Sequence, residues 1–164
     1  MDTPLSNSDI ANMLNINVSD IIPYANLSLY NSILDLLPNP YSFKIILLRE
    51  KENRGHWVVL IRQKNKYYYF NSYGEKYDMD MNTISRLARK ILGQDEPKIQ
   101  NLLGGKKMDY NKIKFQNNIS NTCGRYCVYM VQKCIYDKIP FDKVIKNLQR
   151  EGKPTPDEYI LKEI

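Results

Sequence analysis

The sequence predicts a single α+β domain with a small, mostly antiparallel central sheet flanked by helices. Two apolar segments on either side of a short polar turn, between residues 56 and 71, predict a β-hairpin. Helical patterns come before and after this hairpin. Helices and strands therefore occupy separate parts of the chain, as in an α+β fold. The 164 residues contain no internal repeat and no linker-like segment, so we expect one domain over residues 1–164.

The first part of the chain predicts two short helices and a buried strand. The polar residues 6–9 precede Ile10 in a pattern that predicts a capped helix of about two turns. Residues 27–37 predict a second short helix, which Pro38 ends. Residues 43–48 are apolar without alternation, and this favours a central strand covered on both faces.

The register of the hairpin can be predicted from its turn. A turn centred on residues 64–65 places Val58 opposite Asn71 and His56 opposite Tyr73. Side chains two residues apart on a strand share a face, so His56 and Asn71 project from the same side as diagonal neighbours. A slip of one residue would place them on opposite faces.

The rest of the chain predicts mainly helices. Residues 80–92 form an amphipathic pattern with Met81, Ile84, Leu87, Ala88 and Ile91 on one face. The further expected elements are a loop over 93–111, a strand over 112–116, a helix over 123–136, a helix from Pro140 to about Leu148, and a last short helix after Pro156.

Cys123 is the first candidate for chemistry. It lies where a loop runs into an apolar helix, and Asn121 or Thr122 can cap the first turn while Gly124 leaves space around the backbone. The free N–H groups and the dipole of a helix N-terminus favour a thiolate, which is the nucleophilic form. The alternative is a buried structural cysteine.

His56 is the one histidine of the chain, so a Cys–His mechanism must use it as the base. Asn71 can hold the imidazole ring in one orientation, as the third member of a catalytic triad does. The alternative for a histidine on a strand is packing or a structural hydrogen bond. Gln116, seven residues before Cys123, can donate to an oxyanion together with the Cys123 N–H.

A zinc site built from His56 and the three cysteines is excluded by distance. Cys123 and Cys134 are about 16 Å apart along a helix axis, at a rise of about 1.5 Å per residue, and one ion cannot bridge that distance. Cys127 and Cys134 are therefore interpreted as core residues. We expect neither a metal nor another cofactor.

Charge and composition suggest the surroundings and partners of the protein. Three cysteines, an odd number, favour a reducing compartment over a disulfide framework. No apolar run is long enough to span a membrane, and the first residues lack the pattern of a signal peptide. The net charge is +6, and the basic residues concentrate after residue 48. Such a surface can bind nucleic acid non-specifically, or it can simply keep the protein soluble.

Four segments together resemble the adenain-like cysteine proteases. They are Gly55-His56-Trp57, Phe70-Asn71-Ser72-Tyr73-Gly74, Gln116, and Asn121-Thr122-Cys123-Gly124. The family includes the adenovirus maturation protease, its relatives in virophages, Maverick-type elements and large DNA viruses, and the proteases of ubiquitin-like proteins. The resemblance covers about residues 40–135, and its spacing is closer to the viral branch.

The resemblance implies a role for each matching residue. Cys123 matches the nucleophile, His56 the general base and Gln116 the oxyanion donor. Asn71 stands where the family usually has Asp or Glu, and a neutral amide stabilises an imidazolium less than a carboxylate does. Trp57 matches the aromatic residue after the histidine, and we expect Trp57 and Gly124 to support the site.

The resemblance also implies a function. We expect a viral cysteine endopeptidase that cleaves capsid or core precursors after glycine-containing sites during virion maturation. It would act as a monomer in the virion and in the cytoplasm or nucleus of the host cell, with possible contact to DNA. The disulfide-linked peptide cofactor of the adenovirus enzyme does not carry over, because no cysteine lies outside the helix over 123–136.

Several alternatives remain open. The same site would serve a deconjugating protease of ubiquitin-like modifiers or an acetyltransferase, and a non-catalytic basic DNA-binding protein could retain these residues as a relic. The segment 102–105, Leu-Leu-Gly-Gly, is similar to a cleavage site and could be processed by the enzyme itself, although a plain glycine loop is favoured.

Overall fold

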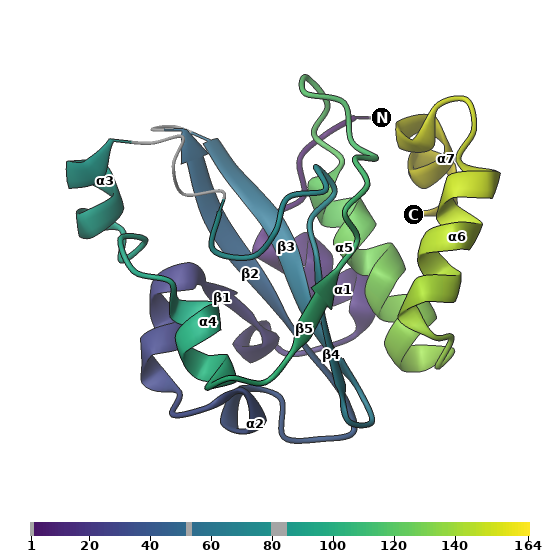
Figure 1. The fold of residues 1–164 in the computed structure, drawn as a ribbon. Coiled ribbons are helices and arrows are strands. Elements are labelled where there is room, and N and C mark those ends of the chain that lie inside the picture. Colours follow the sequence, from purple (N-terminus) through teal and green to yellow (C-terminus); the bar gives the residue numbers. More distant parts are fainter. Residues whose placement is uncertain (1, 52–53, 80–84) are drawn as a thin grey trace.

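The computed structural model describes residues 2–51, 54–79 and 85–164, and it shows an α+β fold in which helices cover both faces of a five-stranded sheet (Figure 1). The strands follow one another across the sheet in chain order. They are β1 (Ile21–Pro23), β2 (Tyr41–Lys51), β3 (Arg54–Gln63), β4 (Lys66–Phe70) and β5 (Met108–Tyr110). The α-helices are α1 (Asn7–Leu14), α2 (Ile33–Leu36), α3 (Arg86–Ile91), α4 (Lys98–Leu103), α5 (Cys123–Val131), α6 (Phe141–Glu151) and α7 (Pro156–Glu163).

The three central strands form an antiparallel unit, as predicted. In the hairpin, Gln63 pairs with Lys66 and Val59 pairs with Phe70, which is the register that a turn at residues 64–65 predicts. The short outer strands β1 and β5 run parallel to their neighbours β2 and β4. The sheet is therefore mixed, with antiparallel pairing at its centre and parallel pairing at its edges.

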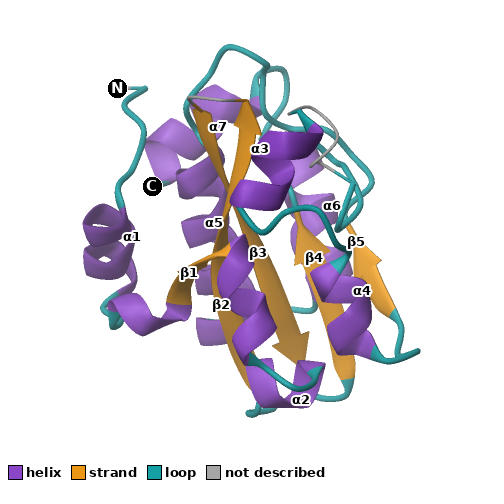
Figure 2. Ribbon diagram, turned by 90° about the vertical axis from the view of Figure 1, so that its left-hand side faces the viewer, coloured by secondary structure: helices purple, strands orange, loops and turns teal. Residues whose placement is uncertain are grey.

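Helices lie on both sides of the sheet (Figure 2), and each side holds one hydrophobic cluster. On one face, α1, α5 and α6 pack against odd-numbered residues of β3 such as Val59 and Ile61. On the other face, α2, α4 and the 3₁₀ helix over Tyr24–Leu29 cover the even-numbered Val58 and Leu60. Because both faces are covered, the central strands read as continuous apolar runs.

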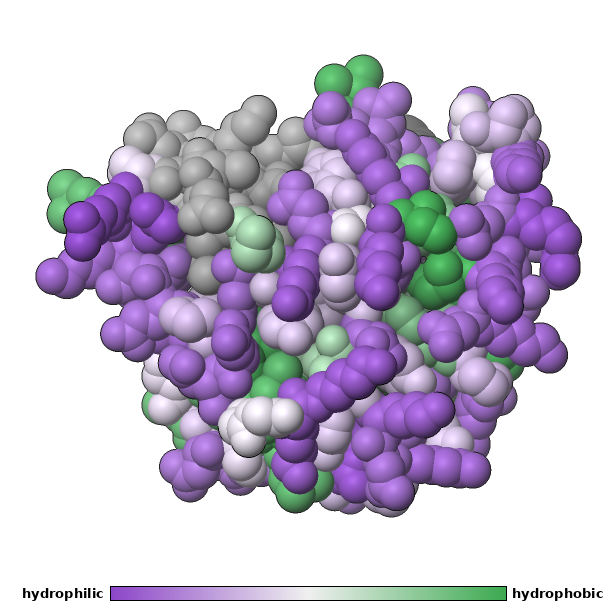
Figure 3. Space-filling view, viewed as in Figure 1, coloured by the Kyte–Doolittle hydropathy of each residue, from purple (hydrophilic) through white to green (hydrophobic). Residues whose placement is uncertain are grey.

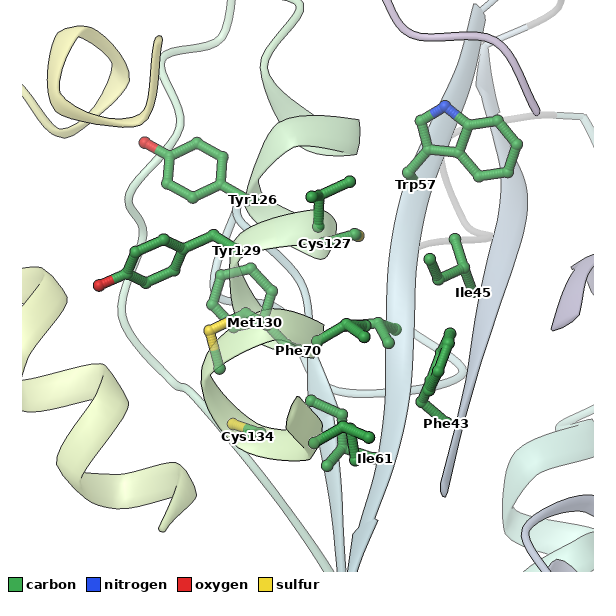
Figure 4. Close-up of a cluster of buried hydrophobic side chains, with 14 of the residues drawn as sticks. Phe43, Ile45, Trp57, Ile61, Phe70, Tyr126, Cys127, Tyr129, Met130 and Cys134 are labelled. Atoms are coloured by element: carbon green, nitrogen blue, oxygen red, sulfur yellow. The ribbon is translucent and has the colours of Figure 1, made fainter. Parts of the chain in front are cut away.

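The helix α5 is the centre of the first cluster. Cys127, Met130 and Cys134 face the sheet side chains Ile61 and Phe70 (Figure 4). After Val131 the chain continues as a π-helical turn over Gln132–Tyr136, so a helical path covers the predicted span 123–136. The prediction that Cys127 and Cys134 are core residues is confirmed, since both are fully buried.

The N-terminal helix α1 has the predicted cap. The Ser6 hydroxyl accepts from the Asp9 N–H, and the Asp9 carboxylate accepts from the Ser6 N–H. The predicted helix over 27–37 is wrong, because this region contains the 3₁₀ helix over Tyr24–Leu29 and then α2. Ser32 separates the two, since its hydroxyl caps α2 by accepting from the Asp35 N–H.

The predictions for residues 93–116 are also wrong. The expected loop contains α4 and β5, and residues 112–116 are not a strand. The carboxylate of Asp78 caps the start of α4 by accepting from the N–H groups of Ile99 and Gln100, and this partner is distant in sequence. Lys112 has a left-handed backbone with φ of 57°, which ends the extended path after β5.

The expected helix over 80–92 is shorter in the structure. Its C-terminal part forms α3, while Met81 and Ile84 lie outside the described residues. Leu87 and Ile91 on α3 are 70% and 76% exposed. The C-terminal helices α6 and α7 match the two predicted there. None of the helices in the described ranges has the length and hydropathy that crossing a membrane requires.

Candidate active site

The side chains of His56 and Asn71 meet as the hairpin register predicts. The Nε2 atom of His56 lies 2.8 Å from Oδ1 of Asn71, and both residues are buried. The same Oδ1 accepts a 2.9 Å hydrogen bond from the backbone N–H of Tyr73. Since a backbone N–H can only donate, the oxygen of the Asn71 amide must face it. His56 therefore carries its proton on Nε2, and Nδ1 is the basic nitrogen of the neutral ring.

Tyr73 covers the imidazole. Its ring is stacked on His56 with the centroids 4.6 Å apart and the planes 17° from parallel. Lys114 lies over the Tyr73 ring, with Nζ 5.7 Å from its centroid. Tyr73 thus contributes its N–H to Asn71 and its ring to His56, and it was not among the predicted site residues. The signal was present, since the same register places Tyr73 opposite His56.

Cys123 is the first residue of α5, and its side chain is partly exposed. Its Sγ atom accepts a hydrogen bond from the backbone N–H of Trp57, at 3.5 Å. The pairing of β3 with β4 ends at Phe70, opposite Val59, so Trp57 lies just beyond it. The nucleophile candidate therefore lies against the backbone of the residue that follows His56.

Gln116 is buried in a turn before α5. Its Oε1 accepts a 2.5 Å hydrogen bond from the Ser72 hydroxyl, and its Nε2 donates a 2.9 Å hydrogen bond to the carbonyl of Ser120. Ser72 follows Asn71, and Ser120 lies three residues before Cys123. Gln116 is thus bonded both to the segment that carries Asn71 and to the loop that carries Cys123.

The loop before Cys123 is held by α7. Thr122 occupies the N-cap position of α5, but its hydroxyl donates to Oδ1 of Asp157 at 2.9 Å and makes no capping bond. The expected cap is therefore wrong. The same oxygen accepts from the hydroxyl of Tyr126, and Oδ2 accepts from the backbone N–H of Asn117. Asp157 could not be found from sequence because it comes from the far end of the chain.

Asn111 holds Asn71 from the other side. Its Oδ1 accepts from the Asn71 N–H at 3.1 Å, and its Nδ2 donates to the Asn71 carbonyl at 2.7 Å. Asn111 follows β5 and Asn71 follows β4, so a side-chain amide continues the pairing of these parallel strands by one step. Because residues 93–111 were predicted to be a loop, no signal in the sequence pointed to Asn111.

Trp57 and Gly124 are buried next to the residues His56 and Cys123 in the chain. Trp57 is 7% exposed, and its Nε1 donates to the carbonyl of Leu5 at 3.0 Å. A Cβ atom on Gly124 would lie 3.1 Å from Cδ1 of Trp57 and 3.1 Å from Cβ of Leu5. The absence of a side chain at Gly124 therefore lets the first turn of α5 approach β3 closely.

The segment 102–105 is half buried and half exposed, since Gly104 and Gly105 lie at the surface. Leu102 and Leu103 are buried at the end of α4, and Gly104 ends that helix in a left-handed conformation. A protease cleaves a peptide that it can hold in an extended form, and the first two residues of this segment are helical and buried.

The sequence and the fold of this chain are similar to those of known viral proteins. No protein-family model matches the chain. The chain is 37% identical over 161 residues to uncharacterized protein V9 of Sputnik virophage, and the match covers 95% of this chain and 91% of that protein. Its fold is similar to that of the ASFV pS273R protease, with a TM-score of 0.56 over 98% of this chain, at 13% identity. The match spans 66% of the protease, slightly less than two thirds of its length. At this identity the similarity concerns the fold alone.

Proposed function

This chain belongs to the family of the Sputnik virophage protein V9, and we propose that it is a cysteine endopeptidase with Cys123, His56 and Asn71 as its catalytic triad. The observation that carries the proposal is the hydrogen bond from His56 Nε2 to Asn71 Oδ1, together with the contact between the Cys123 sulfur and the backbone N–H of Trp57, the residue after His56. It leaves Nδ1 as the base of the ring, while the Cys123 thiol begins a helix. The similarity to the fold of a viral protease supports the same proposal.

The reaction would proceed in two halves. Nδ1 of His56 takes the proton of the Cys123 thiol, and the thiolate attacks the carbonyl carbon of the scissile peptide bond. The oxyanion accepts hydrogen bonds from the N–H of Cys123, at the first position of α5, and from the amide of Gln116. His56 returns the proton to the leaving amine, and water then hydrolyses the thioester with His56 again acting as the base.

Asn71 acts in this scheme by orienting the ring. Its oxygen is held by the Tyr73 N–H and its backbone by the Asn111 amide. The imidazolium formed during the reaction keeps its Nε2 proton directed at this oxygen. A neutral amide fixes the ring without the charge stabilisation that a carboxylate would add.

The proposed substrates are capsid or core precursor proteins of a virus, cleaved after glycine-containing sites. Membership of a virophage protein family supports the viral setting, and the Cys–His–Asn arrangement supports the peptide chemistry. We further propose that the enzyme acts as a monomer in the virion and in the cytoplasm or nucleus of the host cell.

The test is cleavage of candidate precursors by the purified protein. We expect peptides from capsid precursors with glycine-containing sites to be cut, and Cys123→Ala to abolish turnover. Products identified by mass spectrometry give the site of cleavage. Cleavage of ubiquitin-like conjugates alone would support a deconjugating protease, and turnover of acetyl-coenzyme A would support an acetyltransferase. Binding functions that survive Cys123→Ser, with no turnover of any substrate, would support a non-catalytic protein.

A second candidate function is non-specific binding of nucleic acid. Basic side chains surround the tip of the β3–β4 hairpin, where two adjacent hollows of about 570 and 340 Å³ share Asn65, Lys66 and Tyr68. The basic residues that line them are Arg62, Lys64, Lys66, Lys106, Lys107 and Lys138. Figure 3 shows hydrophilic side chains over most of this face. Two acidic residues, Asp109 and Asp142, also line the first hollow. The six basic residues outnumber them, so the local charge is positive.

Binding of labelled duplex DNA at several salt concentrations tests this function. We expect the logarithm of the affinity to fall linearly with the logarithm of the salt concentration. The double substitution of Lys106 and Lys107 by Glu should weaken binding strongly, while the matched substitution of the exposed Lys143 and Lys146 on α6 should weaken it less. Equal losses from the two pairs would assign binding to the overall charge of the protein.

A further inference from the structure

Ser72 joins the two halves of the proposed active site. It follows Asn71 directly, and it is 1% exposed. Its carbonyl accepts from the backbone N–H groups of Phe115 at 2.8 Å and of Gln116 at 3.0 Å. Its hydroxyl lies 2.5 Å from Oε1 of Gln116. One residue therefore bonds to both the backbone and the side chain of Gln116.

The surroundings of Gln116 determine which way its amide points. The carbonyl of Ser120 can only accept, so the hydrogen bond at 2.9 Å requires the NH₂ group of Gln116 on that side. The oxygen Oε1 must then face Ser72, and the hydroxyl of Ser72 must donate to it. In the opposite orientation, Oε1 and the Ser120 carbonyl would repel each other.

We infer that Ser72 is a positioning residue that fixes the Gln116 amide with its NH₂ group, and not its oxygen, available to the oxyanion. The inference rests on the proposed function. Nε2 carries two hydrogens, one of which Ser120 accepts. A flipped amide would present oxygen to the developing negative charge and raise the barrier to its formation. The Ser120 carbonyl requires the NH₂ group on its own side, and Ser72 holds the amide in this orientation because its hydroxyl donates to the buried Oε1.

Removal of the hydroxyl isolates this role. Ser72→Ala keeps the backbone carbonyl and its two hydrogen bonds, and it deletes only the donor to Oε1. We expect kcat to fall about ten-fold with KM nearly unchanged, because the oxyanion exists only after substrate has bound. Affinity for a peptide aldehyde, which forms a tetrahedral adduct with Cys123, should fall in parallel.

A double-mutant cycle separates positioning from a general structural effect. If Ser72 acts through Gln116, then Ser72→Ala should change kcat by less than about two-fold in a Gln116→Ala background. A loss of the same size in both backgrounds would overturn the inference. Ser42→Ala, which removes a hydroxyl bonded to the Asn39 carbonyl far from the site, is the control for handling of the variants.

A measurement that needs no activity decides the orientation itself. In the ¹⁵N-labelled protein, the side-chain NH₂ signal of Gln116 is assigned by its loss in Gln116→Ala. We expect its hydrogen exchange with solvent to be at least about ten-fold faster in Ser72→Ala, because the amide can then rotate. Unchanged exchange would overturn the inference. Absence of turnover in the unmodified protein would count against the proposed function, while the exchange result would still decide the role of Ser72.

Discussion

The three cysteines lie along one helical path and differ in their exposure to solvent. Cys123 is partly exposed, whereas Cys127 and Cys134 are buried. Burial raises the pKa of the Cys127 thiol well above its ordinary value of 9.0, and it raises the pKa of Cys134 to about 12. Both buried thiols therefore stay protonated at neutral pH, and the thiolate is the reactive form.

Selective alkylation follows from this difference. We expect iodoacetamide to modify Cys123 in the native protein at neutral pH and to leave Cys127 and Cys134 unmodified. Peptide mapping by mass spectrometry measures the modified fraction of each cysteine. In Cys123→Ala the native protein should take up no label, and in denaturant the remaining two cysteines should both react. Labelling of Cys127 or Cys134 at the rate of Cys123 in the native state would contradict the burial.

The contact between Asn71 and His56 makes a second prediction at this scale. Asn71→Ala removes the acceptor that orients the imidazole, and we expect kcat/KM to fall by about 10²-fold, less than the loss in Cys123→Ala. Asn71→Asp keeps an oxygen for both Nε2 of His56 and the N–H of Tyr73, so it should lose less activity than Asn71→Ala. Steady-state kinetics compares the two variants. If Asn71→Ala costs nothing, the orienting role is wrong.

Two segments without regular structure, the turn after Asn71 and the chain before Gln116, bring the candidate residues together. Gly74 closes the turn after Asn71 with a φ of 78°, and its N–H donates to the Asn71 carbonyl at 2.7 Å. A Cβ atom at this position would lie 2.7 Å from the carbonyl carbon of Ile113 and 2.8 Å from the backbone nitrogen of Lys114. The segment after Asn71 and the segment before Gln116 therefore pack backbone against backbone.

Substitution of Gly74 tests this packing. Gly74→Ala introduces both a left-handed alanine and a clash with backbone that cannot rotate away, and we expect a loss of about 3 kcal/mol or more in the free energy of unfolding. Gly104→Ala is the matched control. Gly104 also has a positive φ, of 54°, but nothing lies within 4 Å of its Cβ position, so about 1 kcal/mol should be lost. Denaturant unfolding measures both, and equal losses would show that the contact with Ile113 and Lys114 is unimportant.

The elements that sequence could predict are those whose signals are local. The hairpin register depends on a turn between two apolar strands, and it correctly brought His56 and Asn71 together. The cap of α1 also followed from neighbouring residues, and α5 begins at the predicted Cys123 although the expected cap is absent. The sequence therefore supplied the central strands and the pair of residues that they carry.

The elements that sequence missed depend on distant partners. The start of α4 is capped by Asp78, and the loop before Cys123 is bonded to Asp157 on α7. Residues 112–116 were predicted to be a short apolar strand, but Lys112 is left-handed and the N–H groups of Phe115 and Gln116 both donate to the Ser72 carbonyl. Long-range hydrogen bonds overrode the local pattern in each case.

The whole molecule buries several acidic groups in their neutral form. Burial and the nearby carboxylate of Asp78 raise the pKa of Tyr24, and burial and the carboxylate of Asp157 raise the pKa of Tyr126. The two buried thiols behave in the same way. The folded protein therefore keeps protons that the unfolded chain releases at alkaline pH.

Stability should consequently fall as the pH rises. Below about pH 9 these groups are protonated in both states, and their contribution to stability is fully present. Above it the unfolded state binds fewer protons than the native state, so the free energy of unfolding decreases with pH through the range up to about pH 12. Denaturant titrations at about pH 8 and about pH 11 measure the difference. A constant free energy of unfolding would contradict the prediction, and recovery on return to about pH 8 controls for chemical damage.

The short outer strands have a consequence for the behaviour of the protein at high concentration. β1 and β5 each contain three residues, and β1 ends at Pro23, which has no backbone N–H. A neighbouring copy that approached either edge would find few backbone groups to bond, although the strands behind them are strongly apolar. The short edge strands thereby disfavour growth of the sheet from one molecule to the next.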